Sequence, residues 1–258
     1  MNTKDWADFP YDTSPYTYEG QALADAWPQL HRGDCEPLPD DKQLLEAWRR
    51  YHAGDFAGAV DLAGEIGIAA HAVANKASGI YADYLEEDDD TKLAIYEAGI
   101  ARAEEAIGQF PDDANAHYFH AFLLGRYSQC ISITKALSQG VGGKIRESLD
   151  TALELAPEHA EAHTAMGLYH AEIIDKIGKM IGAMTYGASA DEAMKQFERA
   201  LELSPDAPIA HIEYGNGLYL LFGDKRLDES NAAYEKAAAI EPIDAMQKLD
   251  VEFAKASI

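Results

Sequence analysis

One phrase constrains this chain more than any other feature: a proline, five further residues and then a histidine. It occurs three times, as Pro111–His117, Pro157–His163 and Pro205–His211. A second phrase of small or apolar residues, spaced by four and then three, ends five residues before Pro157, Pro205 and Pro242. Its members are Ile145, Leu149 and Ala152, then Ala193, Phe197 and Ala200, then Ser230, Tyr234 and Ala237. Such spacing places side chains on one helix face. Self-similarity on this scale indicates stacked supersecondary units, so the sequence predicts an all-α superhelix of helical hairpins.

The charge balance limits the classes of partner that the chain is expected to bind. The 258 residues carry a net charge of −24, and 47% of them are apolar. A globular protein with so acidic a surface is expected to repel nucleic acid, and no basic stripe offsets this. It equally disfavours an anionic membrane surface. The charge is compatible with basic or polar peptides, so we expect a protein or peptide partner, with its identity and the oligomeric state left open.

Location is predicted from what the sequence does not contain. The first residues have no apolar core of the kind that a signal peptide needs. No run approaches the roughly 20 apolar residues of a membrane helix. The two cysteines, Cys35 and Cys130, give neither a disulfide framework nor a metal spacing. The sequence therefore predicts a cytoplasmic protein without a membrane span.

Residues 1–40 lie outside the repeat. They hold half of the ten prolines, together with Trp6, Trp27 and several tyrosines. Proline at this density prevents long helices, and aromatic residues are rare in disordered tails. We expect an irregular arm that packs on the body, with a short helix near Gln21–Trp27. A second interpretation is that the arm lies in the protein's own binding groove and competes with a partner.

Residues 41–258 form the predicted repeat domain. A first helix carries Leu44 and Trp48, a second follows the turn at 53–57, a third covers 68–86 and a fourth covers 91–109. Three full hairpins follow Pro111, in which an acidic residue just after each proline is expected to cap the first helix. A partial unit after Pro242 is predicted to cover the end of the stack, as terminal repeats must.

This domain resembles the tetratricopeptide repeat family. The match rests on the second phrase above and on small residues in the first helices, at Ala121, Gly167 and Gly215, and it is strongest over 111–242. The family period is about 34 residues, whereas the successive prolines here lie 46, 48 and 37 residues apart.

The extra residues lie between the two helices of a unit, at 126–144 and at 175–190. Both stretches are predicted to elongate a first helix, and both end in small or glycine-rich turns. Either they bury their apolar faces on each other, or Ile133, Leu137, Met180 and Met184 wall an apolar pocket. Long-armed repeats of this kind resemble the T components of TRAP-type transporters and the mitochondrial microtubule-regulator family.

No catalytic, cofactor or metal site is predicted. Gly140–Lys144 lacks the spacing of a phosphate loop and the Ser or Thr after the lysine. The three repeated histidines occupy equivalent positions of successive units, too far apart to share one ion. We expect them to be packed between helices and hydrogen-bonded.

The family resemblance implies a concave groove lined by the first helices. Carried over to this sequence, its slots are Asn115, Tyr118, Phe122, Gly125, Glu161, Thr164, Leu168, Ala171, Ile209, Ile212, Asn216 and Tyr219, with Arg126 and Glu172 beside them. The groove lacks the Lys, Asn and Arg set with which some members clamp a terminal carboxylate. Aromatic anchors with a few amides suit a helix or an extended peptide that lies in the groove. The first hypothesis is a non-enzymatic protein-interaction scaffold, and the alternative is a small-molecule or lipid-binding protein with its pocket between 126–144 and 175–190.

Overall fold

The structure is a computed structural model that describes residues 3–258. Within that range the chain forms helices and no strand. The helices are α1 (Gln21–Leu30), α2 (Lys42–His52), α3 (Phe56–Ile66), α4 (His71–Tyr84), α5 (Asp89–Gln109), α6 (Ala114–Cys130), α7 (Ile133–Ser138), α8 (Val141–Leu155), α9 (Ala160–Ile177), α10 (Lys179–Tyr186), α11 (Ala190–Leu203), α12 (Pro208–Phe222), α13 (Leu227–Ala238) and α14 (Ala245–Ala256). Short 3-10 turns lie at Ser14–Tyr16, Ile68–Ala70 and Gly223–Arg226.

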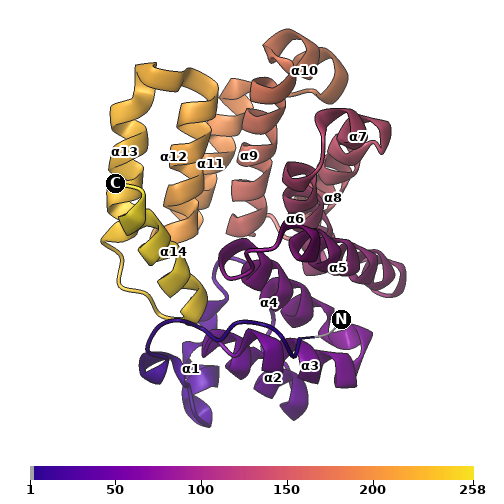
Figure 1. Ribbon diagram of the computed structural model, residues 1–258, viewed down its shortest axis with the longest axis vertical. Helices are drawn as coiled ribbons and strands as arrows, with labels where there is room; N and C mark the ends of the chain where they lie inside the picture. Colours follow the sequence, from indigo (N-terminus) through magenta and orange to yellow (C-terminus); the bar gives the residue numbers. More distant parts are fainter. Residues whose placement is uncertain (1–2) are drawn as a thin grey trace.

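The helices pack as successive antiparallel hairpins. The pairs are α2 with α3, α4 with α5, α6 with α8, α9 with α11 and α12 with α13, and α14 packs on α13. Figure 1 shows the hairpins following one another around the molecule, with α14 returning toward the first hairpin. The predicted all-α superhelix of helical hairpins is confirmed.

Local signals explain where the first helices begin. Asp113 caps α6, because its carboxylate accepts hydrogen bonds from Asn115 N at 2.9 Å and Ala116 N at 3.3 Å. The predicted acidic caps of the next two units are wrong. Glu158 and Asp206 lie one residue too early, since α9 is capped by His159 and α12 starts on Pro208. Proline suits this first position because its fixed φ is already helical.

The three repeated histidines hold the turn that precedes their helix. In each unit the imidazole Nε2 donates to the carbonyl oxygen of the unit's own proline. The distances are 2.8 Å from His117 to Pro111, 3.0 Å from His163 to Pro157 and 2.8 Å from His211 to Pro205. The predicted hydrogen bonding is confirmed, and the histidine ties each inter-unit turn to its first helix.

The inserted stretches depart from their prediction. They do not elongate the first helices but form separate short helices, α7 and α10. Ile131 is extended, and the Ser132 hydroxyl accepts from Lys135 N, which starts a new helix. Gly178 adopts φ +84° and ends α9 there, a backbone conformation that glycine adopts without steric cost.

The N-terminal segment is held against the body by aromatic side chains. The Trp6 ring stacks on Tyr81 with centroids 3.9 Å apart. Tyr16, Leu23 and Trp27 are buried in the main core. The predicted short helix is present as α1 and extends to Leu30. None of the helices among residues 3–258 combines the length and the apolar character needed to cross a membrane.

Candidate binding pocket

The inner face of the array is closed because the C-terminal segment binds the first hairpins. His52 Nδ1 lies 2.9 Å from Asp244 Oδ2, and the Tyr18 hydroxyl donates to the carbonyl oxygen of Ile243 at 2.6 Å. Further along α14, the Tyr84 hydroxyl donates to Asp250 at 2.5 Å. The concave surface is therefore walled on the side of α14 and is not an open groove along its whole length.

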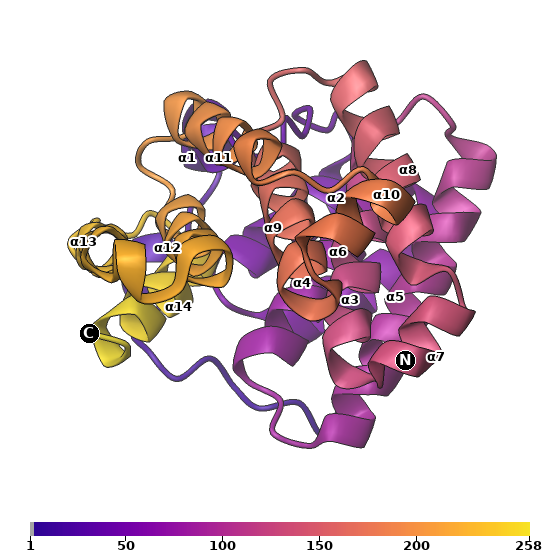
Figure 2. The same cartoon turned by 90° about the horizontal axis from the view of Figure 1, so that it is seen from above.

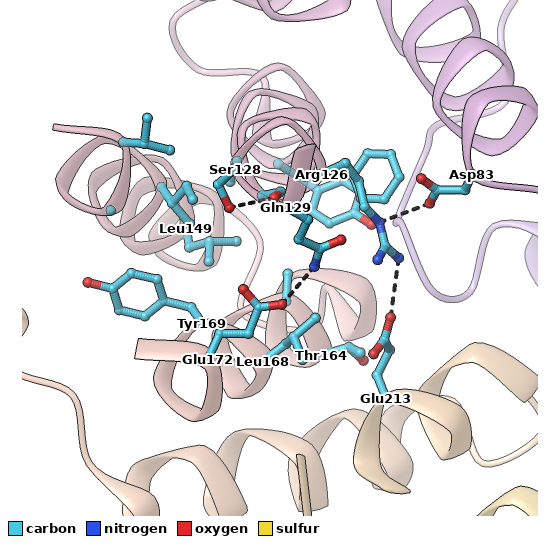
Figure 3. A pocket seen from close by; sticks show the side chains of 18 of the residues that line it. Asp83, Arg126, Ser128, Gln129, Leu149, Thr164, Leu168, Tyr169, Glu172 and Glu213 are labelled. Carbon is cyan, nitrogen blue, oxygen red and sulfur yellow. Dashed lines mark hydrogen bonds and ion pairs between the residues drawn. The ribbon is translucent and has the colours of Figure 1, made fainter. Parts of the chain in front are cut away.

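A pocket with a volume of about 170 Å³ lies inside this ring, between the two long hairpins. Its apolar walls come from α7 and α8 on one side and from α9 and α10 on the other. They include Ile133, Leu137, Ile145, Leu149, Leu168, Tyr169, Ile173, Ile177 and Tyr186. Figure 3 shows Leu149 on one of these walls and Leu168 and Tyr169 on the other. The lining residues of α4, α6 and α12 include the charged side chains Asp83, Arg126 and Glu213.

Arg126 is held in the pocket by two carboxylates. Its guanidinium lies 2.9 Å from Asp83 Oδ2 and 3.2 Å from Glu213 Oε1, and it stacks over the Phe122 ring at 5.5 Å (Figure 3). Burial alone would lower the pKa of Arg126, but the two carboxylates raise it above its usual range. The paired arginine joins α4, α6 and α12 and leaves no net positive charge in this part of the pocket.

A second polar group stands where the two hairpins approach each other. Gln129 donates to Glu172 Oε1 at 2.7 Å, and Lys176 contacts the other oxygen at 2.8 Å (Figure 3 shows the first of these). Gln129 and Lys176 are exposed while Glu172 is half-buried. These groups can hydrogen-bond to a polar part of a ligand whose apolar part occupies the walls.

A wider cavity of about 540 Å³ adjoins the pocket at its other end. The two share the lining residues Lys76, Glu161, Thr164, Ile209, Met246 and Asp250. Gln29, Leu30, Arg32 and Gly33 of the N-terminal arm line the wider cavity. Gly33 also accepts from Glu161 N at 2.9 Å. The arm therefore contributes to the wall of the inner space and contacts one of the slot residues.

At the junction, Lys76 forms a buried ion triad. Its Nζ lies 2.6 Å from Asp34 Oδ2 and 2.7 Å from Glu161 Oε1. Burial would raise the pKa of Asp34, but Lys76 and His31 hold it well below its usual range. The pKa of Glu161 is raised, because burial outweighs the attraction of Lys76. The triad connects the arm, α4 and α9.

Asp250 predicts a pH dependence of stability. The side chain is fully buried, its Oδ2 has no hydrogen-bond partner among the described residues, and burial raises its pKa to about 8. An unfolded aspartate ionises near 3.9, so the folded state holds the extra proton and stability falls as pH rises from about 4 to about 8. We expect Asp250→Asn to reduce this slope, which is at most about 1.4 kcal/mol per pH unit for one proton. Urea unfolding of both proteins across this range measures it, and identical slopes would contradict the assignment.

The structure places the predicted slot residues unevenly. Of the twelve slots and the two residues beside them, nine line the pocket, namely Tyr118, Phe122, Gly125, Arg126, Glu161, Thr164, Leu168, Glu172 and Ile209. The other five do not line it, and one of them, Ala171, is fully buried. Asn115 is buried against Glu36 and His159, and Ile212 is buried on another face of its helix. Asn216 is hydrogen-bonded to Tyr234, and Tyr219 is exposed. Binding by any of them stays a prediction.

The residues predicted to wall a pocket between the insertions line it on one side only. Ile133 and Leu137 line the pocket, whereas Met180 and Met184 project from α10 and are 73% and 84% exposed. Ile173 and Tyr186 take their place. Sequence reasoning missed them because it extended α9 as one straight helix, whereas the break at Gly178 changes the direction of the chain.

Sequence comparison finds a family model and several relatives that match this chain. Residues 69–252 match the sequence model of the family described as regulator of microtubule dynamics protein 1-3. Regulator of microtubule dynamics protein 3 of Rattus norvegicus is 27% identical over 133 residues, which are 48% of this chain and 28% of that protein. The Mus musculus protein is 27% identical over 127 residues, which are 47% and 27% of the two chains. The matched segment thus spans between a quarter and a third of these relatives.

A solved structure has the same fold. The crystal structure of a thermophilic TPR protein from Thermus thermophilus superimposes with a TM-score of 0.58 and 19% sequence identity. The superposition covers 83% of this chain and 97% of the other. The fold is therefore that of a tetratricopeptide repeat protein, as the sequence resemblance implied.

Proposed function

This chain belongs to the regulator of microtubule dynamics protein 1-3 family, and on that premise we propose that it is a non-enzymatic binding protein whose ligand occupies the central pocket. The family fold supplies the stacked hairpins that build it. The two free cysteines, both exposed, support a cytoplasmic location as part of this proposal.

The ligand that this pocket suits best is an amphiphile with an apolar chain. The single observation that carries this choice is the pair of facing apolar walls, Ile133, Leu137 and Ile145 opposite Ile173 and Ile177. Ligand sites in proteins are concave and mostly apolar, with a few polar groups that fix orientation. Gln129 and Glu172 supply such groups beside the walls.

A protein partner is the second candidate, and it is the finer form of the interaction-scaffold role that the fold favours. It is supported by the exposed tyrosine of α12, Tyr219, which a partner could cover without entering the ring. The acidic surface would steer a basic partner. In this version the pocket receives an apolar side chain of the partner in place of an amphiphile.

The test is binding of a fluorescent acyl-chain probe to the full chain. We expect saturable binding that Leu168→Glu reduces at least tenfold, because the new carboxylate would have to be buried against the apolar chain. Leu168 is half-buried, so the fold should tolerate the change. Leu227→Glu, on the outer helix α13, is the matched control and should bind as the unmodified protein does.

Two outcomes would contradict the amphiphile. The unmodified chain would bind no probe, or the two variants would lose binding equally. Mass spectrometry of organic extracts from the purified protein gives a second readout, which should show a chain-bearing compound in the control and less of it in Leu168→Glu. Capture of a basic protein that depends on Tyr219 and not on Leu168 would favour the second candidate.

A further inference from the structure

Two segments of this acidic chain contain basic residues and no acidic ones. We call them tip 1, residues 131–146, and tip 2, residues 176–190. Tip 1 holds Lys135, Lys144 and Arg146, and tip 2 holds Lys176 and Lys179. Neither contains any of the 45 Asp and Glu residues, although the whole chain has a net charge of −24. The net charge of the whole chain therefore does not describe the two tips, which are basic.

The fold brings the two tips to one end of the molecule. Tip 1 comprises α7 and the start of α8, and tip 2 comprises the end of α9 together with α10. Figure 1 shows α7 and α10 together at the end farthest from α1 and α2, and Figure 2 looks down on that end. Residues of both tips line the central pocket from opposite sides, among them Leu137 and Tyr186.

Three of the five cations are available for a partner. Arg146 is paired with Asp150 and Lys176 with Glu172. Lys135, Lys144 and Lys179 are exposed and have no ion pair with a carboxylate among residues 3–258. Lys135 lies instead over the Tyr127 ring at 5.6 Å. Unpaired basic groups at the end of an acidic body create a directed positive field.

The same tips expose large apolar side chains. Met180 and Met184 are spaced by four on α10, and Ile181 lies beside them with 55% of its surface exposed. Across the pocket, Ile133 and Leu137 are each 49% exposed. Contiguous exposed apolar residues rimmed by charge indicate an interaction site. An apolar helix face with lysines at its edge is the pattern of segments that lie in the membrane interface.

We propose that the two tips form a docking surface for an anionic lipid membrane. Lys135, Lys144 and Lys179 contact the headgroups, while Met180, Ile181 and Met184 enter the interface. The acidic remainder of the molecule is repelled by the same membrane, so the protein docks with its two tips toward the bilayer. The pocket then faces the bilayer between α7 and α10. This surface stands on the tips alone and does not require that the pocket hold an amphiphile.

An anionic membrane fits these tips better than an acidic protein does. Lysines alone would serve either partner, because both attract positive charge. The methionines and Ile181 distinguish them, since flexible apolar side chains on a short exposed helix gain by burial in the acyl boundary. An acidic protein surface presents no such phase to α10.

Vesicle co-sedimentation of the full chain tests the proposal. The vesicles are phosphatidylcholine alone, or phosphatidylcholine with phosphatidylserine, each at low and high salt. We expect binding only to the phosphatidylserine vesicles, weakened by salt. One lysine near such a surface changes affinity about fivefold. The triple variant Lys135→Glu, Lys144→Glu and Lys179→Glu should therefore bind at least ~100-fold more weakly.

The matched control carries the same charge change elsewhere, as Lys42→Glu, Lys236→Glu and Lys255→Glu, all on exposed side chains. It should stay within about threefold of the unmodified protein, because those sites lie outside the tips. A second variant, Met180→Ser with Met184→Ser, should bind weakly with unchanged charge. Circular dichroism melts confirm folding, which exposed substitutions leave intact.

Three results would overturn the docking surface. The first is that the unmodified chain does not bind phosphatidylserine vesicles. The second is that the tip triple variant and the control triple variant lose vesicle binding equally. The third is that the chain binds polyglutamate but not vesicles. The last result would identify an acidic protein as the partner of the tips. Leu168→Glu keeps the vesicle test separate from the pocket, because it should lose the acyl probe while retaining vesicle binding.

Discussion

Replacing Lys76 by methionine is expected to lower the free energy of unfolding by about 3–5 kcal/mol. The methionine fills similar volume, but it leaves the carboxylates of Asp34 and Glu161 without the ammonium that both contact, at 2.6 and 2.7 Å. Breaking a buried ion pair by removing one partner costs far more than an exposed pair contributes, because an unpaired charge stays buried. Urea denaturation of the full chain, followed by circular dichroism, measures the change.

Two further variants give this prediction its control. Lys42→Met, on an exposed lysine at the start of α2, should change stability by no more than about 0.5 kcal/mol. Adding Glu161→Gln to Lys76→Met should recover part of the loss, since it removes one of the two stranded charges. A loss below about 1 kcal/mol in Lys76→Met would mean that water replaces the ammonium and that the triad does not hold the arm to α4 and α9.

The triad also shows what a sequence pattern cannot predict. Each repeat phrase recurs at a fixed position within its unit, so the phrases predict the helices of three hairpins. These helices are α6, α8, α9, α11, α12 and α13. Lys76 lies in the region before Pro111 where the phrases are weak, and Asp34 lies in the arm, which has no repeat at all. Their contact joins residues 42 positions apart. No local spacing predicts such a pair, since only the closed arrangement of the hairpins brings them together.

The spacing that makes the repeat recognisable also predicts which side chains of a helix share one face. Spacing along α6 and α9 fixes which side chains face inward, so Phe122 and Leu168 line the pocket. The transfer was less effective on α12, where Ile212 is buried against α13 and α14. There the C-terminal helix packs on the array and converts an inner face into core. Glu213, the neighbouring residue, reaches the pocket instead and pairs with Arg126.

Phe197 is the side chain on which the spacing of α9, α11 and α12 depends. It is 1% exposed, and its ring fills the room that two glycines leave free. A Cβ built at Gly167 would come 2.8 Å from the Phe197 ring, and one built at Gly217 would collide with the opposite edge of the ring. Glycine is therefore needed at both positions, because the aromatic ring occupies the space that a side chain there would fill.

We expect Phe197→Ala to cost about 3–5 kcal/mol of unfolding free energy, since a fully buried aromatic is lost and a cavity is left between rigid helices. Phe253→Ala, on a ring that is 45% exposed, is the control and should cost clearly less. Gly217→Ala should also destabilise, but in the Phe197→Ala background its methyl group occupies the empty space. The double variant should then be more stable than the sum of the single losses predicts. Additive losses in urea denaturation would contradict this account, because they would mean that ring and glycine do not share one space.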